Sequence, residues 1–598
     1  METSPQKTLE RVISQRAIQM SSYFPCQIYV LGLFSGVCVT YLSLAAVGSF
    51  KTVGLGAVYS TPAAPFFSDN SAAIDTEDEW RVSFLYSAWS AQLNASENEA
   101  SKLLNVSNVP DAPHLEDCKL SASLNERLDS LEENGTFPPW TLWKGQLGLK
   151  LLQQTTGTDQ EQRSSGVSSE GAYPPWVLGS DEDNIPFTRR VQRDIWMHQH
   201  PSNCSDPNIR FLIADWEILP GFGIGAQIAG MCGILAIAIN ENRVLVTKHY
   251  NRADHNGCQG SSRSHWSCYF FPETSRECQD RALELMTRQE SWHKGLVTGK
   301  ENYTSKEIWA GRIPRIWGSP WSYLQPTTDI SGNLVISHRK MDRRWWRAQA
   351  VRYLMRFQSE YTCRLMNIAR HEAFGKQAAK VVLASLRQDW PEARINKSKS
   401  DLGRFIWSNH KPWIPRPILS MHVRMGDKAS EMKLVGFEEY MVLAERIRRR
   451  FPNLHTIWLS TEMQEVIDQT KLYPNWNFYY TTVLRQVGNM RMAAYEASLG
   501  RETSTNYPLT NFLMATEADF FIGALGSTWC FLIDGMRNTG GKVMSGYLSV
   551  NKDRFCKRKM KKGKVMETRL TPEWIAEQRK DAYVHPSCWL NVTPINML

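Results

Sequence analysis

Two stretches of this chain alternate short apolar runs with segments of helical spacing, and this order constrains the fold more than any other feature. The first stretch begins with the apolar run Ile209–Trp216, passes through a glycine-rich turn into an alanine-rich segment at Ile228–Ile239, and ends in RVLVT at Arg243–Thr247. Apolar runs of this length predict buried strands, and the segment between them predicts a helix. A strand, helix, strand order predicts an α/β unit with a parallel sheet.

A second α/β series follows the proline-rich segment KPWIPRP at 411–417. Two such units predict two Rossmann-like lobes, in which ligands bind beyond the carboxyl ends of the strands. Before the second series, apolar residues at helical spacing from Val351 to Ile368 predict one long helix. The elements expected in the second series are strands at Ile418–Val423, Thr456–Ser460 and Ala518–Ala524 and helices at Phe437–Arg449, Thr461–Leu472 and Trp529–Arg537.

Length, composition and charge exclude several classes of protein. At 598 residues the chain has room for three or four structural units. Its 42% hydrophobic and 22% charged residues exclude a fully disordered, collagen-like or multi-span membrane protein. The net charge of +9 is spread along the chain, which favours an anionic ligand over a nucleic acid, because a nucleic-acid binder carries a sharper basic stripe.

An uncharged segment near the N-terminus predicts a membrane anchor. The 23 residues Ile28–Phe50 are long enough to cross a bilayer. Lys7, Arg11 and Arg16 precede the segment and Lys51 follows it, so the positive-inside rule places the N-terminus in the cytosol and the rest of the chain in a lumen. The alternative is a cleaved signal peptide, although the apolar stretch is longer than is usual for one.

Cysteines and glycosylation sequons agree with that orientation. Cys258, Cys268 and Cys278 are spaced by ten residues without a C-x-x-C pair, so disulfides are favoured over a zinc site. Seven N-x-S/T sequons follow the anchor, at Asn94, Asn105, Asn134, Asn203, Asn302, Asn396 and Asn591.

The acidic triplet at 181–183 has the D-x-D spacing of some metal-binding motifs. It lies in a polar linker and is therefore interpreted as a solvated loop.

A cluster of charged residues follows the predicted strand Ile418–Val423, in the sequence HVRMGDKASE. Arg424 offers a planar fork for two phosphate oxygens, and Lys428 adds a point charge. Glu431 is a candidate general base for an acceptor hydroxyl. The alternative is a solvated surface loop. In the first unit, Gly223 and Gly225 permit either a close ligand approach or tight packing of the turn.

These motifs resemble a known family. HVRMGDKASE and the following GFEEYM are similar to the H-V-R-R-T-D-K and E-E-Y-M segments of the α-1,6-fucosyltransferase family, which adds core fucose to N-glycans. The resemblance continues after these segments through TIWLSTE, LYPNWNF and NFLMATEADFFIGALGSTWC. In the first unit it includes GFGIGAQ and WSCYF, and over residues 205 to 550 the motifs occur in the same order as in the family. It implies a GT-B-like fold and an inverting transferase that uses GDP-fucose as co-substrate, without a cofactor or a metal.

The resemblance also implies roles for individual residues. Arg424 would contact the donor diphosphate, Lys428 would assist the leaving group and Glu431 would be the base. The sequence departs from the family at Met425, where the family has a second Arg, and at Gly523, which replaces one Cys of a paired loop that holds Cys530. The remaining donor-binding candidates are His422, Asp427, Glu462, Asn511 (where the family has Asp), Ser527, Gly223 and Gly225.

The expected protein is a single-pass type II Golgi membrane protein that transfers fucose to a glycan. N-glycans are one expected acceptor, and the bond formed on them would be an α-1,6 linkage. The alternatives are a protein O-fucosyltransferase, a cell-wall glycan fucosyltransferase, or a non-catalytic glycan-binding protein. A weak helical pattern in the stem leaves a homodimer open. The expected organisation is a cytosolic tail at 1–27, an anchor at 28–50, a luminal stem at 51–205, a first catalytic lobe at 206–410, a second, donor-binding lobe at 411–555 and a tail at 556–598.

Overall fold

The structure is a computed structural model, and the chain divides into two compact units, Met1–Ala73 and Ile74–Leu598. All described residues belong to the second unit: 76–94, 109–129, 174–177, 181, 183–217, 223–310, 312–324, 328–330, 333–334, 341–386, 412–426, 434–488, 490–524, 526–541 and 547–550. The expected anchor at 28–50 lies outside them. Within these ranges, no helix combines the length and the apolar character that a membrane crossing requires.

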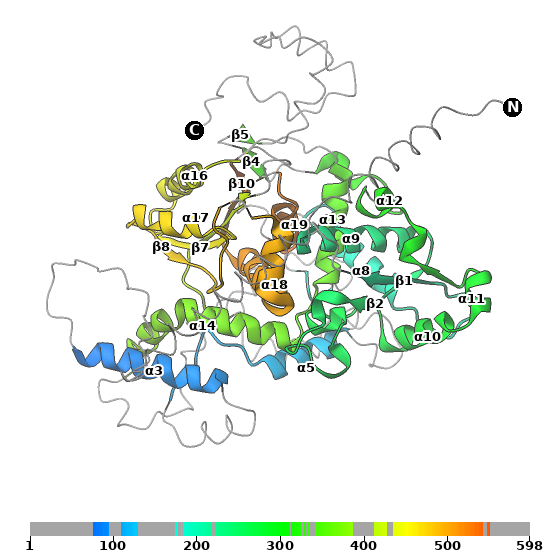
Figure 1. Cartoon of the computed structure of the whole chain (residues 1–598), viewed down its shortest axis with the longest axis horizontal. Helices are drawn as coiled ribbons and strands as arrows, with labels where there is room; N and C mark the ends of the chain where they lie inside the picture. The colour runs from blue at the N-terminus through cyan, green and yellow to red at the C-terminus, as the bar shows by residue number, and fades with distance from the viewer. Residues whose placement is uncertain are drawn as a thin grey trace, which may run out of the picture. The chain divides into compact units, whose positions relative to one another are not determined.

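The first sheet is parallel, with strand order β2-β1-β3. Figure 1 labels β1 and β2. Apolar side chains alternate along β1 between two layers: Leu212 and Ala214 pack with α9, whereas Phe211 and Ile213 pack with α10. This alternation explains why the run forms a buried strand with a helix on each face. The elements are β1 (Phe211–Trp216), α9 (Ile224–Asn240), β2 (Val244–Tyr250), α10 (Arg276–Met286), α11 (Gln289–His293), β3 (Val297–Gly299) and α12 (Ser305–Ala310).

The second sheet has seven strands in the order β5-β4-β10-β9-β6-β7-β8, parallel except for the pair β4 and β5. The chain steps outward from β6 to β7 and β8 and then returns through α18 to β9, on the other side of β6. The strand order therefore reverses between β6 and β9. The elements are β4 (Thr328–Ile330), β5 (Asn333–Leu334), β6 (Ile418–Val423), α16 (Phe437–Arg450), β7 (Thr456–Thr461), α17 (Gln464–Gln469), β8 (Asn477–Tyr479), α18 (Met492–Glu517), β9 (Phe520–Gly523), α19 (Thr528–Asn538) and β10 (Tyr547–Ser549).

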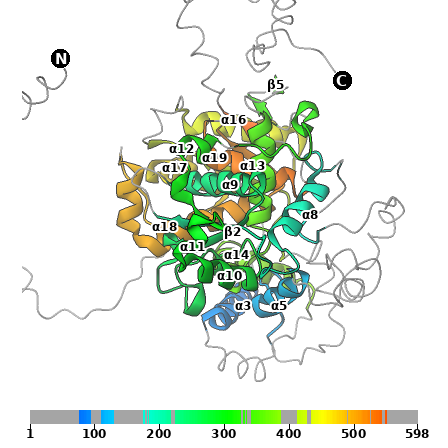
Figure 2. The same ribbon diagram turned by 90° about the vertical axis from the view of Figure 1, so that its right-hand side faces the viewer.

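A layer of helices joins the two sheets. Helix α13 (Met341–Leu354) packs against both α9 and α19, as Figure 2 shows from the side. The approach is close at Gly535 of α19, where a Cβ atom would lie 2.9 Å from Ala348 Cα. Residues of both sheets and of these three helices belong to one hydrophobic cluster. The described part of the chain is thus α/β with two parallel sheets around a shared helical core.

The prediction of one long helix across 351–368 was wrong. The structure has two helices, α13 and α14 (Glu360–Leu383), separated by residues 355–359. The break has a local cause, because Ser359 Oγ accepts a hydrogen bond from Thr362 N and caps α14. The preceding residues pair with another segment, since Phe271 N donates to Phe357 O at 3.1 Å. Apolar residues keep a helical spacing across residues 355–359, so the sequence pattern did not indicate that the helix ends there.

The range 51–205 contributes three described helices that contact the rest of the unit: α3 (Thr76–Asn94), α5 (Cys118–Asp129) and α8 (Thr188–Gln199). Helix α3 runs alongside α14 (Figure 1), and α8 places Trp196 in the shared core. The preference for disulfides over zinc is confirmed, and the described residues contain no group of side chains suited to a metal. The disulfides among the described cysteines are Cys118–Cys363, Cys204–Cys278 and Cys258–Cys268.

Candidate functional site

Polar residues gather at the carboxyl end of β6. Leu419, Met421 and Val423 pack into a cluster with α16. Successive side chains of a strand point to opposite faces, so His422 and Arg424 share the other face, where α18 and α19 lie. Because the strand order reverses between β6 and β9, this edge is the topological switch point at which open α/β sheets bind ligands.

Arg424 forms a buried ion pair with Glu462, which directly follows β7. Glu462 Oε1 accepts hydrogen bonds from Arg424 Nη1 and, at 3.1 Å, from Met425 N. Arg424 Nη1 also donates to Met425 O at 2.9 Å. The two charged side chains are only 8% and 4% exposed, so their attraction is weakly screened by water. Glu462 therefore holds the guanidinium group in a defined position at the end of the sheet.

His422 lies beside this pair as an uncharged imidazole. Its Nδ1 is 3.2 Å from Ser460 Oγ, the residue opposite it on β7. Burial and, second, the positive charge of Arg424 lower the pKa of His422 to about 3. Its Nε2 is buried and, among the residues that the structure describes, has no hydrogen-bond partner. At neutral pH this nitrogen can therefore form one hydrogen bond to a ligand without bringing a second positive charge.

The N-termini of two helices meet near the same edge. Gly223 precedes α9 and Ser527 precedes α19, and neither supplies a side-chain cap within the described residues. At Gly225 a Cβ atom would lie 3.0 Å from Trp529 Cε3, so this glycine permits the first turns of the two helices to touch. Uncapped N–H groups at a helix N-terminus favour anions. For Gly225, the structure shows the packing role that the sequence left open.

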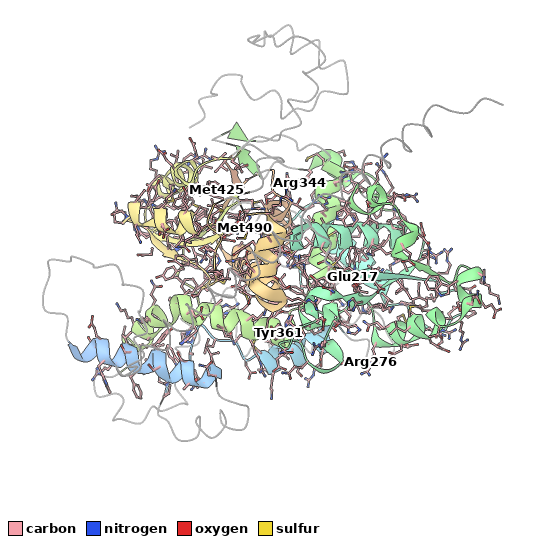
Figure 3. The ribbon with its side chains drawn as sticks, in the orientation of Figure 1. Glu217, Arg276, Arg344, Tyr361, Met425 and Met490 are labelled. Atoms are coloured by element: carbon pink, nitrogen blue, oxygen red, sulfur yellow. A yellow bond between two sulfur atoms is a disulfide. The ribbon has the colours of Figure 1, made fainter. Side chains whose placement is uncertain are left out.

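The first sheet presents a buried arginine at the carboxyl end of β2. The Arg252 side chain is 0% exposed, donates from Nε to Gln227 Oε1 and from Nη2 to Glu496 Oε2, both at 2.9 Å. Gln227 Nε2 in turn donates to the backbone oxygen of Glu217, at the end of β1, at 3.1 Å. Glu217 is labelled in Figure 3. The sequence interpretation did not select Arg252. The sequence signal was weaker, because Arg252 lies five residues after the predicted strand Arg243–Thr247, whereas Arg424 directly follows its predicted strand.

Helix α18 connects these two groups of residues. It consists of two helical parts that meet at a kink at Gly500, where φ is 74°. The first part carries Glu496, the partner of Arg252. After the kink, Tyr507 has a pKa raised well above its ordinary value by burial, by Tyr495 and by the carboxylate of Glu462. The carboxyl ends of the two sheets thus share α18 as a neighbour.

The structure holds Asn511 away from the carboxyl end of the sheet. Its Oδ1 accepts from Trp458 Nε1 at 2.9 Å and its Nδ2 donates to Thr481 Oγ1 at 3.3 Å. Trp458 lies in the middle of β7, so these bonds place the Asn511 amide beside the body of the strand and not beside Arg424. Three further candidates, Asp427, Lys428 and Glu431, lie outside the described residues.

Comparison with known proteins gives a distant structural likeness. No protein-family model and no curated protein matches the chain. Among solved structures, the chain is similar to that of a mutant of Arabidopsis thaliana FUT1 in complex with GDP, with 9% sequence identity, a TM-score of 0.24, and coverage of 64% of this chain and 83% of that chain. The site described above therefore stands on the geometry of this chain's own residues.

Proposed function

We propose that this protein is a GDP-fucose-dependent fucosyltransferase that transfers L-fucose to a hydroxyl group of a glycan, with α-1,6 transfer to N-glycans as the acceptor reaction that the motif resemblance favours. The observation that carries the proposal is the position of Arg424. It lies at the switch point of a GT-B-like parallel sheet, is held by Glu462, and has the uncharged His422 beside it. A planar guanidinium at this position suits a diphosphate.

The proposed reaction is a single displacement. The acceptor oxygen attacks C1 of fucose, the bond from C1 to the β-phosphate oxygen breaks, and GDP leaves with the bonding electron pair. Glu431 takes the proton of the acceptor hydroxyl, the role that the resemblance implies for it. Negative charge grows on the diphosphate as the bond breaks, and a positioned Arg424 stabilises that charge. Attack from the side opposite GDP inverts the configuration at C1.

The test is nucleotide binding to the full-length chain. We expect GDP to bind more tightly than UDP or CMP, and Arg424→Lys to weaken GDP binding at least tenfold, because lysine keeps the charge that Glu462 requires but loses the fork. The matched control is Arg356→Lys. Arg356 likewise forms a buried ion pair with a carboxylate, that of Asp129, to which it donates two hydrogen bonds, and this pair lies outside the candidate site. This control should lower stability and leave GDP affinity unchanged.

Transfer itself is then measured with GDP-fucose and a panel of N-glycans, peptides and plant cell-wall oligosaccharides. The acceptor that is fucosylated selects among the transferase alternatives. Binding of GDP without transfer to any acceptor would favour the non-catalytic protein. A full-length, folded chain that binds none of the three nucleotides would contradict the proposal, as would an Arg424→Lys variant with unchanged GDP affinity.

We further propose that the chain is a single-pass type II Golgi protein anchored by Ile28–Phe50, with its catalytic part in the lumen. The support is the uncharged segment with its flanking basic residues. Three disulfides in the part of the chain that the structure describes add to it, because disulfides persist in oxidising compartments.

A further inference from the structure

A buried side-chain amide lies beside the pair of Arg424 and Glu462. Gln486 belongs to the irregular segment between β8 and α18, and it is 2% exposed. Both atoms of its amide, Oε1 and Nε2, are buried, and neither has a hydrogen-bond partner among the described residues. An unpaired buried amide costs free energy that folded proteins rarely leave uncompensated. A ligand that forms a hydrogen bond with this amide would therefore offset that cost.

The backbone of Gln486 is fixed without help from the amide. Gln486 N donates to Glu462 O at 2.9 Å, and Gln486 O accepts from Gln464 N at 3.1 Å. The neighbouring Arg485 anchors the same segment by donating from Nε to Thr461 O at 3.2 Å. The main chain thus places the Gln486 side chain next to Glu462, and within the described part of the chain the amide holds no other residue in place.

The amide nitrogen and the guanidinium of Arg424 lie close to one point in space. A Cβ atom built on Gly426 would be 3.2 Å from Gln486 Nε2 and 3.8 Å from Arg424 Nη1. Gly426 follows Met425, which is labelled in Figure 3, and its φ of 61° suits glycine. Arg424 Nη1 directs its two hydrogens to Glu462 and Met425, so the guanidinium contributes positive charge at this point, and Gln486 Nε2 contributes a hydrogen-bond donor. A ligand group that suits both is a negatively charged acceptor.

We infer that the side-chain amide of Gln486 donates a hydrogen bond to the diphosphate that Arg424 binds. The inference rests on the proposed function, because the diphosphate is that of GDP-fucose. It adds a binding residue from a segment that carries none of the recognised motifs. The amide supplies a donor without a charge, so it can be buried beside Glu462 while the nucleotide is absent, at a lower cost than a second cation.

The first experiment replaces the amide by an apolar side chain of similar length in the full-length protein, Gln486→Met. We expect the Kd for GDP, measured by calorimetry, to rise at least tenfold, which is 1.4 kcal/mol at 25 °C. We expect the Tm without nucleotide to stay the same or to rise, because the variant removes an unpaired buried group. A purely structural amide gives the opposite pattern, a lower Tm and an unchanged Kd for GDP.

Gln192→Met is the matched control, because it removes a buried amide that is fully hydrogen-bonded. Gln192 Oε1 accepts from Trp176 Nε1 at 3.0 Å, and Gln192 Nε2 donates to Gln349 O at 2.8 Å. Its loss removes both of these buried hydrogen bonds. The control should therefore lower the Tm and leave the Kd for GDP unchanged, which separates a loss of stability from a loss of binding.

Gln486→Glu provides a second variant of nearly identical shape. It replaces a donor by a negatively charged acceptor, so it should weaken GDP binding more than Gln486→Met does. Tight GDP binding by the wild type and by both variants overturns the inference and leaves the proposed function intact. A wild-type protein that binds no GDP overturns both.

Discussion

At the scale of single residues, position 523 bears on whether Cys530 is a thiol or part of a disulfide. Gly523 ends β9 directly beside the buried thiol of Cys530. A Cβ atom at position 523 would lie 2.7 Å from Cys530 Sγ and 3.4 Å from Cys530 Cβ. The Cβ atoms of disulfide-bonded cysteines lie about 3.5–4.5 Å apart, so the site is close to disulfide geometry. The backbone at positions 523 and 530 therefore nearly fits a disulfide, although residue 523 is a glycine.

We therefore predict that Gly523→Cys forms a disulfide with Cys530. The closed loop is short, and its chain-entropy contribution is about 2 kcal/mol of added stability. Thiol titration of the unfolded, unreduced variant should detect one reactive thiol fewer than in the wild type, and unfolding in denaturant should show the added stability. Gly523→Ser is the control, because it crowds Cys530 in the same way without the bond, and it should be less stable than the wild type. A variant with one reactive thiol more than the wild type would contradict the prediction.

Residues of the candidate site differ in how far the sequence predicts them. Arg424 and Glu462 follow predicted strands, and the structure brings them together. Arg252 lies five residues beyond a predicted strand, so the same rule identifies it less directly. Gln486 could not, because it lies in an irregular segment without periodicity, and its importance depends on contacts with residues far away in the sequence. Asn511 matched a motif, but its amide is used inside the fold.

At the scale of elements, the contact between α3 and α14 depends on a chain of hydrogen bonds through two histidines. Ser90 Oγ donates to Tyr86 O at 3.0 Å, so it accepts from His371 Nε2 at 2.7 Å. His371 Nδ1 must then accept from His114 Nε2 at 2.9 Å. Both imidazoles are therefore neutral, each with its proton on Nε2. This chain ties α3 and the loop before α5 to α14.

We predict that this contact weakens as the pH falls below about 6.5, the ordinary pKa of an unfolded histidine. Burial and, after it, His371 and Arg370 lower the pKa of His114 to about 3, and burial lowers that of His371 to about 4. Between these values and 6.5 the unfolded chain binds more protons than the folded protein. The free energy of unfolding therefore falls with pH, by up to about 1.4 kcal/mol per pH unit for each histidine.

Limited proteolysis of α3 and unfolding in denaturant between pH 7 and pH 4 check this prediction. His371→Phe keeps a ring that can stack on Tyr86 but cannot be protonated, so its stability should depend less steeply on pH. His293→Gln, at the exposed end of α11, is the control and should follow the wild type. An unchanged stability of the wild type between pH 7 and pH 4.5 would contradict the assigned protonation.

Elements were predicted well where periodicity is strong and poorly where strands are short. The strand expected at Ile418–Val423 is β6, and the helix expected at Phe437–Arg449 is α16 with one residue added. By contrast, β10 has three residues and β4 comes from a distant part of the chain, so no local pattern identifies them. The order in which strands pair is a property of tertiary packing, which a local pattern does not contain.

At the scale of the whole molecule, the two sheets are less separate than the sequence suggests. The sequence predicted two lobes, with the proline-rich segment at 411–417 before the second. In the structure, α13 lies between α9 and α19, and all three helices share one hydrophobic cluster. Burial of that cluster couples the two sheets in folding. Arg252 and the pair of Arg424 and Glu462 have α18 as a common neighbour. The candidate site therefore draws on residues at the ends of both sheets.

The orientation proposed for the chain makes a prediction about its surface. Three sequon asparagines lie among the described residues, Asn94, Asn203 and Asn302, and all three are exposed. Asn302 Nδ2 donates to Thr298 Oγ1 at 2.9 Å and still carries a second hydrogen that can be replaced by a sugar. Since N-glycans are added to exposed sequons in the lumen, a luminal chain should carry glycans at these positions.

We expect endoglycosidase treatment of the protein from a eukaryotic host to lower its mass, and Asn302→Gln to remove one glycan. Asn240→Gln changes an exposed asparagine without a sequon and should leave the mass pattern unaltered. Mass spectrometry of the peptides that contain the three sequons checks each position. A chain with reduced cysteines at 118, 204 and 258 and no glycan at any of the three positions would place this part of the protein in the cytosol, because both modifications require the same oxidising, luminal side of the membrane.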